Sequence, residues 1–114
     1  MTARTMTSAA YRATIAARMT ECELLERVRS LARVLGLLVY HTHDSRRSEP
    51  GFPDLVIAGH GRVLYAELKT QRGRLTDAQR LWISQLQDAG SEVHLWRPQD
   101  LLDRTIAKTL GGHA

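Results

Sequence analysis

Three side chains near the middle of the chain have the types and spacing that phosphodiester hydrolysis requires. Asp54 follows Pro53, and Glu67 and Lys69 lie two residues apart at the end of an alternating segment. Mg²⁺ prefers hard oxygen ligands and keeps several waters, so two carboxylates are enough to hold it. Such an ion lowers the pKa of a bound water and neutralises charge on a phosphate, and a lysine beside it can orient the attacking water. The pattern predicts a Mg²⁺-dependent hydrolytic site.

Either motif alone is also common for structural reasons, because Glu-x-Lys pairs are frequent on solvated strands and Pro-Asp is a frequent turn dipeptide. Their order along the chain is more informative. Residues 62–69 alternate in polarity, so Glu67 and Lys69 project from one face of a predicted strand. The Gly-containing turn at 59–61 predicts a hairpin with strand 54–58. That hairpin would bring Asp54 close to Glu67.

The hydrophobic pattern predicts an α/β fold, with a mixed central sheet flanked by helices. Leu24, Val28, Leu31 and Leu35 recur at helical spacing. The expected order, α-β-β-β-α-β-α, is helix 20–35, strands 37–42, 54–58 and 62–69, helix 76–89, strand 91–96 and helix 98–110. Residues 76–89 would be a crossover helix between the last two strands. Residues 1–19 are expected to be a flexible or helical extension of a domain that spans 20–114.

Composition limits the classes of protein that fit. The 114 residues suit one domain, and 14 of the 16 basic residues are arginine, with a net charge of +4. Arginine binds phosphate bidentately, which weakly favours a nucleic-acid partner. A single cysteine, Cys22, excludes an intrachain disulfide and suits the cytoplasm; we expect it to be buried. No apolar run approaches the roughly 20 residues that span a bilayer. Trp82 and Trp96 are expected in the core or an interface.

Taken together, the motifs at 51–54 (Gly-Phe-Pro-Asp) and 67–70 (Glu-Leu-Lys-Thr) resemble the PD-(D/E)xK nuclease core. More narrowly, the chain resembles the VRR-NUC family, small nucleases found in bacteria and phages. The resemblance covers about residues 20–98 and includes Leu-Thr-Asp-Ala-Gln at 75–79. It implies a restriction-endonuclease-like core, Mg²⁺- or Mn²⁺-dependent nuclease activity and similarity to Holliday-junction resolvases. It also implies a homodimer.

The resemblance implies roles for individual residues. Asp54 and Glu67 would be metal ligands and Lys69 the catalytic lysine, and the backbone carbonyl of Leu68 would also face the metal. An acid on the first helix, three positions before its first apolar residue, would complete the ligands. Glu21 fits that position. Glu23 is the alternative, although with Thr20 it also matches a capping box.

Several further residues are secondary candidates. Gln79 would lie beside the catalytic lysine, yet with Thr76 it also matches a capping box. The arginines of two loops could bind phosphates on either side of the cut, or could be plain solvated charge: Arg46, Arg47, Arg72 and Arg74. His41, His43 and Asp44 have no cysteine or third histidine to complete a tetrahedral zinc site. A DNA contact or a structural role is the better interpretation of these three.

The sequence therefore favours a Mg²⁺-dependent DNA endonuclease that acts on branched or structured DNA, with DNA and a second copy as partners and no membrane. Three alternatives stay open. The first is a module of the same fold that binds DNA without cutting it, and the second is a structural or interaction protein whose basic charge is incidental. The third is a plain nicking or restriction-type nuclease.

Overall fold

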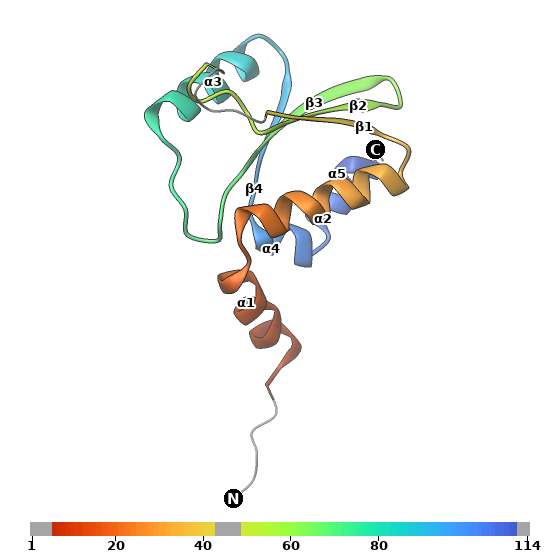
Figure 1. Cartoon of the computed structure of the whole chain (residues 1–114), viewed down its shortest axis with the longest axis vertical. Coiled ribbons are helices and arrows are strands. Elements are labelled where there is room, and N and C mark those ends of the chain that lie inside the picture. The colour runs from red at the N-terminus through yellow and green to blue at the C-terminus, as the bar shows by residue number, and fades with distance from the viewer. Residues whose placement is uncertain (1–5, 43–48, 112–114) are drawn as a thin grey trace, which may run out of the picture.

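A computed structural model of the chain describes residues 6–42 and 49–111. Two helices, α1 (Ser8–Arg18) and α2 (Glu21–Val34), precede three strands, β1 (Leu38–His41), β2 (Leu55–Gly59) and β3 (Arg62–Leu68). Helix α3 (Asp77–Asp88), strand β4 (Glu92–Trp96) and helices α4 (Pro98–Leu102) and α5 (Thr105–Gly111) follow (Figure 1). None of the described helices is long and apolar enough to cross a membrane.

The strands form one mixed sheet in the order β1-β2-β3-β4. Strands β2 and β3 are an antiparallel hairpin closed by His60 and Gly61, which both have positive φ, at 52° and 78°. This is the backbone that a tight two-residue hairpin turn requires, and Gly61 adopts it without a Cβ clash. Strand β4 lies parallel to β3, so α3 is the crossover between them. The predicted hairpin, crossover and mixed sheet are confirmed.

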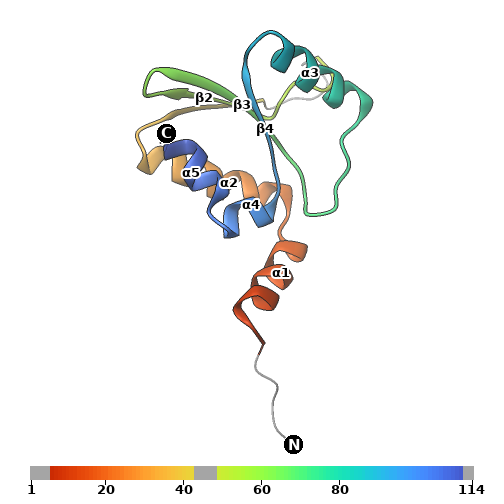
Figure 2. The ribbon, with the colours of Figure 1, turned by 180° about the vertical axis from the view of Figure 1, so that it is seen from behind.

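Helices α2, α4 and α5 cover one face of the sheet, and α3 lies beyond the opposite face (Figures 1 and 2). The core lies between the sheet and the three helices. Fully buried apolar side chains of β2 and β3, such as Ile57 and Leu64, pack there with Leu24 of α2 and Ile106 of α5. Trp96 is in this core, 2% exposed, as predicted. Burial of these side chains is the main force that holds the sheet against its helices.

The N-terminal helix α1 is attached to the rest of the molecule through α4. Ala16 is buried, and so is Met19, which links α1 to α2. Thr20 then begins α2 with a complete capping box: its hydroxyl accepts from the Glu23 N–H at 3.1 Å, and its own N–H donates to Oε1 of Glu23 at 3.1 Å. The capping box expected for this helix is therefore confirmed.

Two expectations are wrong. The last helix is not continuous from 98 to 110, because Arg104 has φ of 70° and interrupts it between α4 and α5. The side chain of Asp103 accepts from the Thr105 N–H at 2.9 Å and begins α5 anew. Cys22 is exposed rather than buried. It lies two residues before Leu24, about 200° around the helix from that buried side chain.

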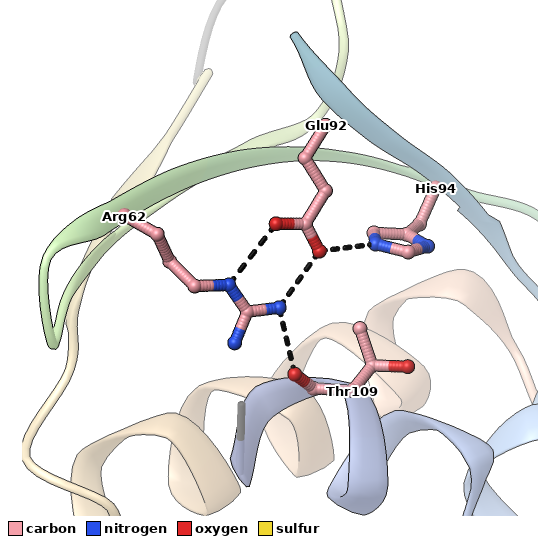
Figure 3. A network of polar contacts seen from close by, with 4 residues as sticks. All are labelled: Arg62, Glu92, His94 and Thr109. Atoms are coloured by element: carbon pink, nitrogen blue, oxygen red, sulfur yellow. Dashed lines mark hydrogen bonds and ion pairs between the residues drawn. The ribbon is translucent and has the colours of Figure 1, made fainter. Parts of the chain in front are cut away.

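A polar network ties β3 and β4 to α5 on the helix-covered face (Figure 3). Arg62 donates to both carboxylate oxygens of Glu92, at 3.0 and 2.7 Å, and to the carbonyl of Thr109 at 2.8 Å. His94 contacts the same carboxylate at 2.7 Å. The hydrogen bonds from Arg62, and secondarily from His94, lower the pKa of Glu92 to about 2. This carboxylate is therefore an ionised structural group.

Candidate active site

Asp54 and Glu67 face each other across the open end of the β2–β3 hairpin. The register pairs Leu55 with Ala66, and continuing it by one residue puts Asp54 opposite Glu67. Oδ2 of Asp54 accepts a hydrogen bond from the backbone N–H of Leu68 at 2.8 Å. This bond holds the Asp54 side chain against the end of β3. Two carboxylates that lie 13 positions apart in the sequence are thus brought together by strand pairing.

Glu67 is the only buried charged side chain among the described residues, at 1% exposed. When both acids are ionised, neither carboxylate oxygen of Glu67 meets a hydrogen-bond donor among those residues. Burial first, and then a hydrogen bond and charge repulsion from the Asp54 carboxyl, raise the pKa of Glu67 to about 9, and the charge of Lys69 partly opposes them. A buried carboxylate without partners is costly in free energy. A cation held between Asp54 and Glu67 would supply the missing partner, so the pair fits a hard divalent ion.

Lys69 follows β3 directly, and its backbone N–H donates to the carbonyl of Trp96 at 3.1 Å. Its side chain is half-buried and close enough to Glu67 to affect the pKa of that acid. The strand therefore delivers a carboxylate and an ammonium group to one place. This is the arrangement expected from their two-residue spacing.

A cavity of about 260 Å³ lies beside the acidic pair, and its lining residues are Glu21, Cys22, Leu25, His41, Asp54 and Leu68. Glu21, at the start of α2, thus shares a cavity with Asp54. The competing acid, Glu23, is instead held in the capping box and lines a different cavity. Within residues 6–42 and 49–111, no group of three His, Cys, Asp or Glu lies close enough to hold a metal. The structure therefore brings Asp54 and Glu67 together and leaves Glu21 across the cavity.

Residues 5–99 match the family model described as the VRR-NUC domain. The chain belongs to this family. A solved structure described as a VRR_NUC domain is similar to it, with a TM-score of 0.65 and 19% sequence identity. The alignment covers 77% of this chain and 96% of the other, which shows a shared fold. Comparison with curated proteins found no match.

Membership of the VRR-NUC family makes the chain a nuclease-type domain, which supports its assignment to the hydrolases. The fold expected from the sequence is that of the family. The family match begins at residue 5, so it includes helix α1. The segment before residue 20 is therefore largely within the matched region.

The VRR-NUC domain holds Gln79 in the capping box of α3. Its Oε1 accepts from the Thr76 N–H at 2.9 Å, and its own N–H donates to the Thr76 hydroxyl at 3.1 Å. The structure gives Gln79 this structural contact, and its role beside the catalytic lysine stays a prediction. Of the arginines predicted to bind DNA, Arg72 and Arg74 are exposed. Arg46 and Arg47 lie outside the described residues, as do His43 and Asp44.

Gly51, the first residue of the motif at 51–54, is a positioning residue, a role that was not predicted for it. Its φ is 88°, and a Cβ there would lie 2.4 Å from the carbonyl carbon of Ala78. The segment before Asp54 therefore packs directly on the first turn of α3. The ring of Phe52 packs edge-on against those of Trp82 and Tyr65, with ring centroids 5.1 and 6.1 Å apart. Trp82 is thus a half-buried side chain on this packing surface rather than a core residue. In the sequence, only the glycine before Phe-Pro-Asp indicates that this segment packs closely on α3.

Proposed function

We propose that this VRR-NUC domain is a Mg²⁺-dependent DNA endonuclease, in which Mn²⁺ can replace Mg²⁺. The observation that carries the proposal is Glu67, a buried carboxylate without a partner among the described residues that lies opposite Asp54. Such a pair is costly without a cation. A catalytic metal ion held by Asp54 and Glu67 would explain why the protein keeps this pair.

Asp54 and Glu67 would hold the ion. Glu21 and Leu68 line the cavity together with Asp54, and the Glu21 carboxylate and the Leu68 backbone carbonyl would be the further ligands. When bound, Mg²⁺ activates water and neutralises charge on the scissile phosphate. The hydrogen bond from the Leu68 N–H keeps Asp54 in its orientation. Because one oxygen of Asp54 is already occupied by this bond, the carboxylate is preorganised before any ligand arrives.

Lys69 would be the catalytic lysine of the proposed reaction. The charge of its ammonium group lowers the pKa of Glu67, so the group is near enough to act on a phosphate that the acidic pair would hold. A cation there can orient the attacking water or stabilise the negative charge of the transition state. Hydrogen-bond donors fixed on a strand end need little reorganisation, and this is the basis of their catalytic effect.

The proposed substrate is branched or structured DNA, cut by a homodimer with two symmetric sites. An exposed apolar row on the sheet supports the dimer: Leu38, Tyr40 and Val63 are 76%, 62% and 50% exposed. The register places them with Ala58 and Val56 on the face opposite α2. Apolar patches of this kind are typical of interaction surfaces.

To test the proposed activity, cleavage of a four-way junction, a linear duplex and a single strand is compared in Mg²⁺, Mn²⁺ or EDTA. The matched variant is Asp54→Asn, which keeps the side-chain size but removes the charge. We expect metal-dependent cutting that the variant loses, and weaker Mg²⁺ binding by calorimetry. Light scattering of wild type and Val63→Arg tests the dimer. DNA binding without cleavage in any ion would instead identify a non-cleaving module.

A further inference from the structure

A concave, basic surface lies beside the loop that follows Lys69. The cavity has a volume of about 570 Å³, and the described residues that line it are Gln71, Arg72, Gly73, Arg74, Leu75, Arg80 and Arg97. Four of these seven side chains are arginine and none is acidic. They come from the loop, from the first turn of α3 and from Arg97, which lies between β4 and α4. Such a concentration of guanidinium groups attracts phosphate.

Arg97 organises this loop from within. Its Nη1 atom donates to the carbonyl oxygens of Gly73 and Thr70 at 2.7 and 2.8 Å, and to that of Gln71 at 3.4 Å. The Gln71 side chain adds a second tie, because its Oε1 accepts from the Gln99 N–H at 2.9 Å. The guanidinium of Arg97 is thus directed at the backbone, and the loop closes around it.

The other arginines remain available to a ligand. Arg72 and Arg74 are exposed and have no ion pair among the described residues. Arg80 pairs with Asp77 at 3.1 Å, but the two side chains are 59% and 103% exposed. A surface pair of this kind contributes little, so a phosphate can compete for Arg80.

We propose that Arg72, Arg74 and Arg80 bind a backbone phosphate of the DNA other than the one that is cut, and that Arg97 is a positioning residue that shapes their loop. This inference rests on the proposed function. Charge-assisted bonds from arginine to phosphate are strong and fix the register of the nucleic acid. The loop begins directly after Lys69, so a phosphate held there would align the strand relative to the acidic pair.

The first test measures binding of a fluorescein-labelled four-way junction and a linear duplex in EDTA, where no cleavage occurs. The double variant Arg72→Ala/Arg74→Ala is compared with Arg27→Ala/Arg33→Ala, which removes the same charge from exposed positions of α2. Each lost phosphate contact should lower the slope of log K against log salt by about 0.9, or about eightfold in affinity at 0.1 M salt. Arg80→Ala should add to this loss. Equal slopes for the two double variants would overturn the inference.

The second test separates positioning from direct contact at Arg97. Arg97→Lys keeps the charge, but its side chain is one bond shorter than that of arginine, so its ammonium group should not reach the carbonyl oxygens that Nη1 of Arg97 contacts. We expect it to weaken DNA binding as much as Arg72→Ala/Arg74→Ala, with no further loss when the changes are combined. Wild-type binding by Arg97→Lys, or additive losses in the combined variant, would refute the positioning role. If Arg97→Lys does not fold, Gln71→Ala loosens the same loop and takes its place, with the same expectations.

Failure of this inference is distinguishable from failure of the proposed function. If wild type cuts in Mg²⁺ and binds in EDTA while Arg72→Ala/Arg74→Ala behaves like its control, only the phosphate site is refuted. If wild type neither binds nor cuts any of the DNA substrates, the proposed function fails and the inference fails with it.

Discussion

Replacement of Glu67 by glutamine should stabilise the metal-free protein and abolish its activity. The side chain is 1% exposed, and neither carboxylate oxygen has a hydrogen-bond partner among the described residues. Glutamine keeps the volume of the side chain and removes the charge that burial and the Asp54 carboxyl disfavour. Residues that serve an active site are often kept at a cost to stability.

The magnitude follows from the burial of this group. An unsatisfied buried polar group costs about 1–3 kcal/mol, and a charged one costs more. Because the pKa of Glu67 rises from 4.5 to about 9, folding at pH 7 must protonate this group, which costs about 1.4 kcal/mol for each pH unit above 4.5. Glu67→Gln removes this cost, so we expect the free energy of unfolding at pH 7 in EDTA to rise by about 1–3 kcal/mol, or roughly 4 °C in Tm per kcal/mol.

Saturating Mg²⁺ should reverse the order of the two proteins. An ion that binds only the folded state at 100 times its Kd adds about 2.7 kcal/mol to the stability of wild type. The variant lacks one carboxylate ligand and should gain far less. Thermal melts in EDTA and in Mg²⁺ measure both effects, with Glu26→Gln, an exposed acid of α2, as the control. The reasoning is refuted if Glu67→Gln is less stable than wild type in EDTA, or if Mg²⁺ stabilises both equally.

Three further predictions concern other parts of the molecule. Because Arg62 lowers the folded pKa of Glu92 from its ordinary 4.5 to about 2, the stability from this pair should be complete above pH 4.5 and fade as the pH falls toward 2. Urea unfolding should show Glu92→Gln to be about 1–2 kcal/mol less stable at pH 7, a figure discounted for partial exposure, and equal to wild type near pH 2. Gly51→Ala and Gly90→Ala share a φ of 88°, but only the first meets backbone atoms. Gly90→Ala should cost about 1 kcal/mol and Gly51→Ala clearly more, and equal losses in urea unfolding would contradict the packing of Gly51 on α3. Lys69→Ala should lower the cleavage rate by about 10²–10³-fold while calorimetry shows Mg²⁺ still bound, and undiminished cutting would exclude its catalytic role.

Much of the fold was predictable because it depends on neighbours close in the sequence. The apolar repeat from Leu24 onward predicts α2, and Thr20 with Glu23 predicts its capping box. The turn around His60 predicts the hairpin, and Pro98 marks the start of α4. The interruption at Arg104 was missed, since a positive φ at a residue other than glycine leaves no clear pattern in the sequence.

The arrangement of the site was only partly predictable. The order of Asp54, Glu67 and Lys69 implies that they meet, given a hairpin between them. Whether Glu21 or Glu23 lies on the side of the acids depends on how α2 packs, and of these two only Glu21 lines a cavity with Asp54. The resemblance to a family supplied the candidate roles, and the comparisons established the family.

The sequence by itself determined the local elements and the order of the chemical groups, because helices, turns and caps depend on side chains within a few positions of one another. Only the tertiary structure decided that Glu67 is buried without a partner among the described residues and that Cys22 is exposed. It also decided that Arg97 holds the loop after Lys69, through carbonyl groups 24 to 27 positions away. These properties arise from contacts between distant segments, and no local pattern encodes which surfaces those segments will share.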